Sequence, residues 1–419
     1  MSNQVKIQVD ELPIEIKEDA IYEINQPNPN SYTHGFFKYP CKFIPEIPKW
    51  SIRKYYNEGL ILDPFAGSGT TLLEASIAGI ESIGTEIDKI AKLIIKVKST
   101  KLDSNEIREV RKFTSNIIMK LDNHEYGENE KIFPAINNLE HWFKNNILDD
   151  LGFLYYSIMH VENIDVREFL MVCMASIIKK VSNADDISPK PYVSNNIIKN
   201  PPEVSSTFAD IVEQYLVGIK KLSNCKLSKI TVDGDATHIN VDDNSISMAV
   251  TSPPYINAFD YVRTLRLENL WLQMATENEL REKKKLYLGT ESIKVKDERE
   301  NLQILQESDL LKEYYDKIVE VDEKRALILK KFFEDMKQNL AEVHRVLVEG
   351  GYYIIVIGNS SIRKIDVESW RVLKDLALNV GYKYSTHFGY EIKNPYIRIP
   401  RGNKGGKIAI DHILVIQKQ

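Results

Sequence analysis

The stretch that decides the fold is GLILDPFAGSGTTLLEASIAGIESIGTEIDKIAKLI, residues 59–94. An apolar run leads into a glycine-rich turn and an apolar helix pattern, and a second short strand pattern and a second helix pattern follow. Over residues 60–100 this order of strand, turn, helix, strand and helix is typical of a parallel sheet with helical crossovers. The sequence therefore predicts an α/β fold.

The glycine turn predicts a ligand site at the end of the first strand. Asp63 ends that strand, and Gly67 and Gly69 allow positive φ and close approach of the backbone to a ligand at a helix N-terminus. The turn lacks the third glycine of the dinucleotide pattern and the lysine of the Walker pattern, which disfavours phosphate binding. Glu86 ends the second strand, where a carboxylate can accept hydrogen bonds from both hydroxyls of a ribose. A ribose without phosphates suits S-adenosylmethionine.

A second polar exit from a strand occurs in SMAVTSPPYINAFDY, residues 247–261. Pro253 and Pro254 cannot continue a sheet ladder, so the chain should leave the strand as a stiff, extended segment. The Ser252 hydroxyl and the Pro253 carbonyl are acceptors that can hold an exocyclic NH2 group, and the ring of Tyr255 can stack on a base. Three further side chains fit either the lining of a target pocket or core packing: Asp260, Tyr261 and Arg263.

The remaining patterns divide the chain into three parts. Residues 1–100 hold an N-terminal segment and the first part of the sheet, and residues 101–225 are mostly helical. Residues 226–419 hold the second part of the sheet. A charged stretch at about 277–325 interrupts this last part and favours solvated helices.

Strand patterns at residues 228–232 and 245–250 support this division. A long helix with one apolar face follows, and Gly350 and Gly351 are predicted to end it as C-cap residues. The strand pattern of residues 352–359 comes next.

Composition sets broad limits on the class of protein. The 419 residues are 43% hydrophobic and 27% charged, which is typical of a globular protein. No apolar run is long enough to span a bilayer, and the polar, acidic N-terminus does not resemble a signal peptide. Three widely spaced cysteines suit a reducing cytoplasm and do not form a metal-site pattern. A formal net charge of −5 leaves room only for a local basic groove for nucleic acid.

Two motifs together resemble those of the DNA amino-methyltransferases. DPFAGSGTT, residues 63–71, is similar to the cofactor motif of that family, and TSPPY, residues 251–255, is similar to its catalytic motif. A serine at position 252 is typical of the cytosine-N4 enzymes, because the adenine-N6 enzymes usually carry Asp or Asn there. The resemblance implies a Rossmann-like class I methyltransferase sheet with a helical insertion between the cofactor and catalytic motifs.

The resemblance also implies which residues bind the cofactor. HGFFKYPCKFIPEIP, residues 34–48, is similar to the segment that lies against the methionine end of S-adenosylmethionine, and Cys41 replaces the usual alanine. DGDAT, residues 233–237, is similar to the motif whose aspartate contacts the adenine of the cofactor. The expected cofactor-binding residues are Lys42, Phe43, Asp63, Phe65, Gly67, Gly69, Thr70, Glu86 and Asp235. The expected catalytic residues are Ser252, Pro253, Pro254 and Tyr255, and no metal is expected.

The implied activity is transfer of a methyl group from S-adenosylmethionine to N4 of cytosine in duplex DNA, with the target base flipped out of the helix. The implied partners are double-stranded DNA and a restriction endonuclease that cuts the same site. Adenine-N6 methylation, methylation of an RNA base, and a binding module without catalysis stay open as alternatives. The helical part of the chain and the charged stretch are both candidates for the target-recognition region.

A basic segment near the C-terminus is a candidate for DNA contact. KNPYIRIPRGNKGGK, residues 393–407, contains five cations and no acid, and its Gly and Pro content favours a loop that could grip phosphates. A solvated hairpin is the alternative. The five cations are Lys393, Arg398, Arg401, Lys404 and Lys407.

Overall fold

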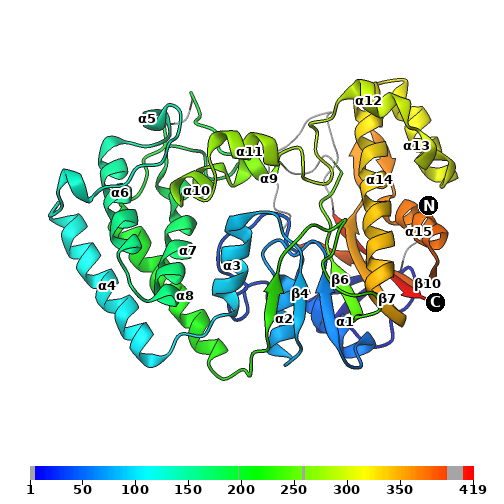
Figure 1. Cartoon of the computed structure of the whole chain (residues 1–419), viewed down its shortest axis with the longest axis horizontal. Helices are drawn as coiled ribbons and strands as arrows, with labels where there is room; N and C mark the ends of the chain where they lie inside the picture. The colour runs from blue at the N-terminus through cyan, green and yellow to red at the C-terminus, as the bar shows by residue number, and fades with distance from the viewer. Residues whose placement is uncertain (1–4, 197, 257–259, 394–408) are drawn as a thin grey trace.

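The fold was analysed in a computed structural model that describes residues 5–196, 198–256, 260–393 and 409–419. A nine-stranded sheet runs through the molecule, with helices on both faces (Figure 1). In spatial order its strands are β1 (Lys6–Val9), β2 (Ile21–Ile24), β10 (Tyr382–Glu391), β11 (Ile410–Lys418), β7 (Leu347–Gly358), β6 (Ile246–Thr251), β3 (Leu60–Asp63), β4 (Ser82–Gly84) and β5 (Ile230–Val232).

Five neighbouring strands, from β7 to β5, are parallel to one another. Strand β11 is antiparallel to both β7 and β10. The predicted Rossmann-like α/β class is therefore confirmed. Because the five strands run in the same direction, the chain leaves β3, β4, β5 and β6 at the same edge of the sheet, where ligands bind in open α/β folds.

Alternation of side chains along the strands divides the core into two layers. Ile61, Met248 and Ile354 belong to one hydrophobic cluster, and their chain neighbours Leu62 and Ala249 belong to the other. Successive strand residues point to opposite faces of a sheet, so strands this apolar must be covered on both sides. Each face of this sheet therefore needs its own layer of helices.

The helices that cover the two faces come from different parts of the chain. Helices α1 (Glu46–Tyr55) and α2 (Thr70–Ile77) contribute Trp50 and Ala75 to one layer, and α3 (Lys89–Ser99) packs beside α2. Helices α14 (Glu323–Val346) and α15 (Ser369–Val380) cover the other face, where Phe332 and Leu373 are fully buried. The sheet is therefore sandwiched between these two helical layers.

A helical lobe lies to one side of the sheet (Figure 1). It consists of α4 (Ser104–Asp122), the 3-10 turn η1 (Glu128–Glu130), α5 (Leu139–Trp142), α6 (Asn145–Met159), α7 (Ile164–Val181) and α8 (Val204–Leu222). Two later helices, α9 (Tyr261–Thr264) and α10 (Arg266–Trp271), pack into the same hydrophobic cluster. The segment after the second motif is thus part of the lobe's core.

The charged segment 277–325 is helical, but the prediction that it is solvated is only partly right. It forms α11 (Glu277–Lys283), α12 (Val295–Glu300), the 3-10 turn η2 (Gln303–Gln306) and α13 (Asp309–Val319). Ile304, Leu311 and Ile318 are buried in the cluster that contains α14. The charges occupy the outer face of these helices, while an apolar face at helical spacing packs inward.

Two further details differ from the sequence-based expectations. Helix α14 ends at Val346, and Gly350 and Gly351 lie inside β7, so their prediction as helix C-caps is wrong. Gly350 has φ +75°, and the pairing of β6 with β7 shifts register across this point. The glycines thus accommodate an irregularity in a strand, not the end of a helix.

Strands β1 and β2 at the edge of the sheet were not predicted either. The structure also contains a small hairpin of β8 (Ser360–Ile362) and β9 (Ile365–Val367). Within the described part of the chain, no helix combines the length and the apolarity that crossing a membrane requires.

Candidate active site

Direct hydrogen bonds join the exits of β3 and β6, which lie more than 180 residues apart in sequence. The Thr251 hydroxyl donates to Oδ1 of Asp63 over 2.6 Å, and the Phe65 amide donates to the same carboxylate oxygen over 3.1 Å. The Thr71 hydroxyl also donates to the carbonyl of Val250 over 3.2 Å. The two sequence motifs are therefore fixed against each other before any ligand arrives.

Asp63 lies beneath the site and does not line its cavity. Its side chain is fully buried, burial raises its pKa to about 6, and the hydrogen bonds from Thr251 and Phe65 act in the opposite direction. Its other oxygen, Oδ2, has no hydrogen-bond partner among the described residues. The carboxylate thus organises the two turns from below.

The glycine turn has the backbone that its sequence predicts. Gly67 and Gly69 have φ of +51° and +77°. A Cβ atom at Gly69 would lie 2.8 Å from Cγ1 of Ile95 on α3, so a side chain at this position would collide with the helix. The buried Nζ of Lys98 donates to the carbonyl of Ser68 over 2.9 Å and supports the turn from the same helix.

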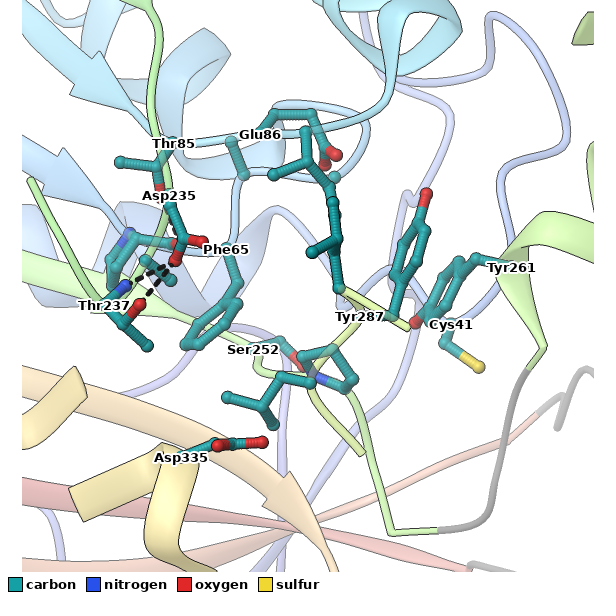
Figure 2. A pocket seen from close by; sticks show the side chains of 18 of the residues that line it. Cys41, Phe65, Thr85, Glu86, Asp235, Thr237, Ser252, Tyr261, Tyr287 and Asp335 are labelled. Carbon is teal, nitrogen blue, oxygen red and sulfur yellow. Dashed lines mark hydrogen bonds between the residues drawn. The ribbon is translucent and has the colours of Figure 1, made fainter. Parts of the chain in front are cut away.

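Above the turn lies a cavity of about 310 Å³, within the usual range for a small-molecule site. Its lining residues come from eight separated parts of the chain: they lie within 39–43, 64–70, 85–87, 234–237, 252–254, 285–290 and 331–338, and Tyr261 is the eighth (Figure 2). The predicted residues that line it are Lys42, Phe43, Phe65, Gly67, Thr70, Glu86, Asp235, Ser252 and Pro254. Asp63, Gly69, Pro253 and Tyr255 are not among its lining residues.

Glu86 is half-buried at one side of this cavity (Figure 2). Burial raises the pKa of its carboxyl to about 8, and the negative charge of Asp88 acts in the same direction. A hydrogen bond of 2.7 Å from the Asp88 amide to Oε1 acts in the opposite direction and lowers this pKa. A more distant cation, Lys283, lowers it slightly. This environment therefore favours the protonated form of Glu86 at neutral pH, and a ligand that donates hydrogen bonds or carries positive charge would favour the ionised form.

Asp235 and Asp335 face the cavity from two different elements (Figure 2). Oδ1 of Asp235 accepts hydrogen bonds from the amide and the hydroxyl of Thr237, over 2.7 and 2.8 Å, which fixes the carboxylate. Asp335 projects from α14 and forms an ion pair with Lys331 one turn earlier. Both acids are acceptors for amino groups. Sequence analysis missed Asp335 because its spacing is that of the polar face of an ordinary helix.

The turn at residues 252–255 contributes Ser252 and Pro254 to the cavity, while Pro253 is buried. The hydroxyl of Tyr255 donates to Oδ1 of Asp411 over 2.6 Å. The turn is thus fixed at both ends, by Thr251 on Asp63 and by Tyr255 on Asp411.

Three tyrosines form an aromatic wall at the cavity rim. Tyr261 stacks on Tyr39 with ring centroids 6.1 Å apart and on Tyr287 with centroids 5.8 Å apart. The Tyr287 hydroxyl donates to Oδ2 of Asp88 over 2.8 Å. Tyr261 lines the cavity and packs against the core of the lobe, so its predicted role in core packing is seen, while its role in a pocket for the target base stays a prediction.

Sequence analysis missed Tyr39 and Tyr287 as cavity residues. The available signal for Tyr287 was an aromatic ring inside a charged run, REKKKLYLGT, residues 281–290. The available signal for Tyr39 was its position shortly before Lys42.

Lys42 and Phe43 line the cavity beside the glycine turn. Burial lowers the pKa of the Lys42 ammonium to about 8, and its Nζ donates to the carbonyls of His34 over 2.6 Å and Pro29 over 3.3 Å. Lys42 therefore holds the residue 29–42 segment in place against the cavity.

The predicted DNA-contacting cations divide into two groups. Lys393 forms an ion pair with Glu23 at 3.2 Å and donates to the carbonyl of Asn25 over 3.0 Å, so the structure commits its ammonium to the N-terminal segment. The other four lie outside the described residues: Arg398, Arg401, Lys404 and Lys407.

The chain's own residues fit S-adenosylmethionine. The cavity offers an acid for a ribose at Glu86, a fixed acid for an amino group at Asp235, and a flat ring at Phe65 (Figure 2). Within the described ranges, no group of three or more His, Cys, Asp or Glu side chains could hold a metal ion.

Comparison with known proteins points to one class. Residues 4–97 match the model of the family N6_N4_Mtase, described as DNA methylase. The Type II methyltransferase M.MvaI of Kocuria varians is 25% identical over 406 residues, which cover 90% of this chain and 87% of that protein. The Type II methyltransferase M.BsoBI of Geobacillus stearothermophilus is 25% identical over 338 residues, covering 68% of this chain and 64% of that protein.

Among solved structures, similarity is remote. A SAM-dependent methyltransferase from Methanosarcina mazei is 10% identical, with a TM-score of 0.32, and the match covers 88% of this chain and 96% of that chain. A Thermus thermophilus structure complexed with S-adenosyl-L-methionine is 19% identical, with a TM-score of 0.23, over 44% of this chain and 53% of that chain.

Strand order, cavity and family match together define an S-adenosylmethionine-dependent methyltransferase. The match to the DNA methylase model and the similarity to Type II methyltransferases support, more particularly, a DNA methyltransferase.

Proposed function

We propose that this protein methylates the exocyclic N4 of cytosine in duplex DNA, as the protective partner of a restriction endonuclease. The observation that supports this proposal best is the convergence of the two motifs. Ser252 and Pro254 line the same cavity as the glycine turn and Glu86, and Thr251 is hydrogen-bonded to Asp63 beneath them. A methyl donor and an acceptor nitrogen held in this cavity would be neighbours, and such alignment supplies much of the rate of a transfer reaction.

The geometry of the cavity supports the proposed cofactor roles. When bound, S-adenosylmethionine supplies an electrophilic methyl group on a sulfonium centre. Glu86 accepts hydrogen bonds from the ribose hydroxyls, and Asp235 accepts one from the amino group of the adenine. Phe65 packs against the rings, and Lys42 and Phe43 lie at the methionine end. Asp63 and Gly69 act from below the cavity by shaping the turn.

The target base must leave the duplex, because its amino group is otherwise out of reach; flipping costs a few kcal/mol. The Ser252 hydroxyl oxygen and the Pro253 carbonyl accept hydrogen bonds from the amino group and orient its lone pair toward the methyl group. Tyr255 stacks on the flipped base, and Pro254 keeps the turn stiff. The amino nitrogen forms the new bond to carbon, the bond between sulfur and carbon breaks, and the nitrogen then loses a proton to solvent.

Cytosine is favoured over adenine by Ser252, which stands where adenine-N6 enzymes usually carry Asp or Asn. The test is to incubate the purified protein with labelled S-adenosylmethionine and duplex DNA, digest the DNA to nucleosides, and identify the product by mass spectrometry. We expect N4-methylcytosine. N6-methyladenine would overturn the choice of base, and methyl transfer to tRNA but not to DNA would support the RNA alternative instead.

DNA contact is proposed for the basic segment that begins at Lys393, and target recognition for the helical part of the chain at 101–225 together with the charged segment. Single-molecule sequencing of DNA from cells that express the protein would report the modified base and its sequence context together. A module that only binds DNA would leave no modified base in that experiment.

A further inference from the structure

A second, smaller cavity lies beside the candidate active site. Its volume is about 30 Å³, which is room for a small polar group and not for a base. It shares two members of the aromatic wall, Tyr261 and Tyr287, with the larger cavity. Two lysines from distant parts of the chain also line it, Lys190 in the stretch SPKPYVS and Lys284 in the stretch REKKK. The fold thus places two cations together at the rim of the site.

The charged groups that line this smaller cavity leave one cation over. Nζ of Lys284 donates to Oδ2 of Asp260 over 2.6 Å, and Glu291 forms an ion pair with Arg325 at 2.7 Å. Lys190 is half-buried, yet its ammonium has no hydrogen bond or ion pair with any residue that the structure describes. A half-buried cation without a counter-ion has lost part of its hydration, so binding of an anion beside it is favoured.

Asp260 shows that the two lysines act on one point. Burial raises the pKa of its carboxyl, but the hydrogen bonds from Lys284 and from the Arg263 amide, together with the charges of Lys284 and Lys190, outweigh burial and lower it. Oδ1 of Asp260 accepts the Arg263 amide over 3.0 Å and caps α9, which fixes the carboxylate. Both ammonium groups are therefore close enough to act on the same anionic group.

Both lysines belong to segments that the fold holds in place. The carbonyl of Lys190 accepts the hydroxyl of Ser188 over 2.9 Å, and Oδ1 of Asp185 accepts the amide of Ser188 over 2.7 Å. The carbonyl of Lys284 accepts the hydroxyl of Thr290 over 2.8 Å. Because the backbone at each lysine is already ordered, binding of an anion there costs less conformational freedom.

A phosphate group of the DNA backbone is the anion that suits this rim. A base that reaches Ser252 leaves the duplex, while its sugar and phosphates remain at the mouth of the cavity. Lysine ammonium groups bind phosphate oxygens as point charges, and such contacts position DNA without reading its sequence. An ammonium has three donors, so Lys284 can keep Asp260 and contact a phosphate as well.

We propose that Lys190 and Lys284 together bind a backbone phosphate beside the flipped nucleotide and so hold the target strand at the rim of the cavity. The inference rests on the proposed function, because it assumes that a DNA base enters past this rim. It deepens that function by assigning a phosphate contact to two segments outside the basic stretch that begins at Lys393.

The experiment compares Lys190→Gln, Lys284→Gln and the double variant with the wild type, all as the full chain. Fluorescence anisotropy measures the dissociation constant of a labelled duplex that contains the methylated site, with S-adenosylhomocysteine present, between about 50 and 200 mM salt. Methyl transfer by the wild type is measured separately. Calorimetric titration with S-adenosylhomocysteine and circular dichroism show whether each variant keeps its cofactor site and its fold.

Loss of either charge should weaken DNA binding and leave the cofactor site intact. At about 50 mM salt we expect each single variant to bind the duplex about 3- to 10-fold more weakly. In the double variant, the plot of log affinity against log salt should be less steep by about one, the value for one phosphate. Affinity for S-adenosylhomocysteine should stay within about twofold of the wild type. Lys190→Arg keeps the charge and should bind the duplex as the wild type does.

Asp260→Asn separates this role from that of a purely structural ion pair. Asn caps a helix about as well as Asp, so α9 should remain folded. If Lys284 only holds Asp260, then Asp260→Asn and Lys284→Gln break the same pair and should weaken DNA binding alike. If Lys284 binds a phosphate, Asp260→Asn removes a negative charge that repels it and should strengthen duplex binding by about 2- to 5-fold at low salt.

Lys54→Gln is the matched control, because it removes the same unit of charge from another lysine that pairs with an acid. Lys54 forms an ion pair with Glu15 at 3.2 Å. It belongs to α1, which lies at the other end of the sheet from α9 and α11 (Figure 1). Its loss should leave duplex affinity within about twofold of the wild type and the salt dependence unchanged.

Failure of the inference and failure of the proposed function give different results. The inference alone is overturned if the wild type methylates DNA and the double lysine variant binds the duplex as Lys54→Gln does. It is also overturned alone if Asp260→Asn weakens duplex binding as much as Lys284→Gln. A wild type that transfers no methyl group to DNA overturns the proposed function and the inference together.

Discussion

The glycine turn at residues 63–71 and the charged segment at 277–325 both border the cavity, yet they differ in how they are built. The turn is held by short-range backbone requirements, with φ of +77° at Gly69, and by hydrogen bonds to β6. The charged segment reaches the cavity with a few side chains, such as Tyr287 and Leu288, while several of its ion pairs, such as Lys312–Asp316, are exposed. The place of the turn at the cavity can be predicted from its own sequence, whereas the place of the charged segment depends on its tertiary contacts.

Substitution of Gly69 by Val tests the first half of this contrast and should have the largest effect. The new side chain would collide with Ile95 and would adopt a left-handed φ, so we expect cofactor affinity to fall by at least about 100-fold and the free energy of unfolding to drop by about 2–4 kcal/mol. Calorimetric titration with S-adenosylmethionine and urea unfolding would measure both.

Gly79→Ala is the matched control for Gly69→Val. Gly79 has φ +79°, but nothing lies within 4 Å of a Cβ atom placed there. It should cost only about 1 kcal/mol of stability, with cofactor affinity unchanged. Equal losses of affinity in both variants would show that the strained φ, and not the contact with Ile95, matters.

Substitution of Tyr287 by Ala tests the second half, namely that the charged segment has a role in the site. Removing the ring leaves Tyr261 without one stacking partner and Asp88 without its hydroxyl donor, so cofactor affinity should fall by about 10- to 100-fold. Tyr287→Phe keeps the ring, so its loss of binding free energy should be roughly a third of the loss in Tyr287→Ala, or less. If Tyr287→Ala binds the cofactor as tightly as the wild type does, the charged segment does not contribute to cofactor binding through Tyr287.

The pH dependence of cofactor binding should reveal Glu86 within the predicted ribose site. Its pKa is raised to about 8 in the empty protein, so its ionised fraction grows as the pH rises through 8. Ribose hydroxyls donate to the ionised form, and affinity should therefore increase roughly tenfold between pH 7 and pH 9 and level off above that. Calorimetry in buffers of different ionisation enthalpy should detect proton release on binding below pH 8. Glu86→Gln should bind more weakly and lose this pH dependence; a slope that persists in Glu86→Gln would assign it to another group.

Removal of an outer ion pair in the charged segment should have the smallest effect. Lys312 pairs with Asp316 over 2.6 Å, and both side chains are more than half exposed. Exposed pairs contribute little because water and salt screen them, so Lys312→Ala should change the unfolding midpoint by less than about 1 °C and leave activity unchanged. A clear loss of DNA affinity at low salt would instead place Lys312 at the DNA surface.

The parts of the molecule that could be predicted are those whose sequence imposes its own geometry. The order of strand, turn and helix at residues 60–100, the positive φ at Gly67 and Gly69, and the stiff exit at Pro253 and Pro254 all follow from local backbone chemistry. The apolar strands β6 and β7 were also recognisable, because a buried strand must be nearly continuously apolar.

What escaped prediction depends on tertiary contacts. Gly350 and Gly351 look like a helix end in sequence, yet the pairing of β7 with β6 extends the strand past them. Tyr287 and Asp335 carry no local pattern that marks a site; they line the cavity because segments far apart in sequence meet at the sheet edge. Such residues become visible only when the distances between separated segments are known.

The bonds from Thr71 to Val250 and from Thr251 to Asp63 have a kinetic consequence. They join the two turns at the floor of the cavity, so we expect the turns to move together. The stacked rings of Tyr39, Tyr261 and Tyr287 at the rim come, by contrast, from three different stretches of chain. We therefore expect a bound cofactor to leave past these rings and not through the joined turns.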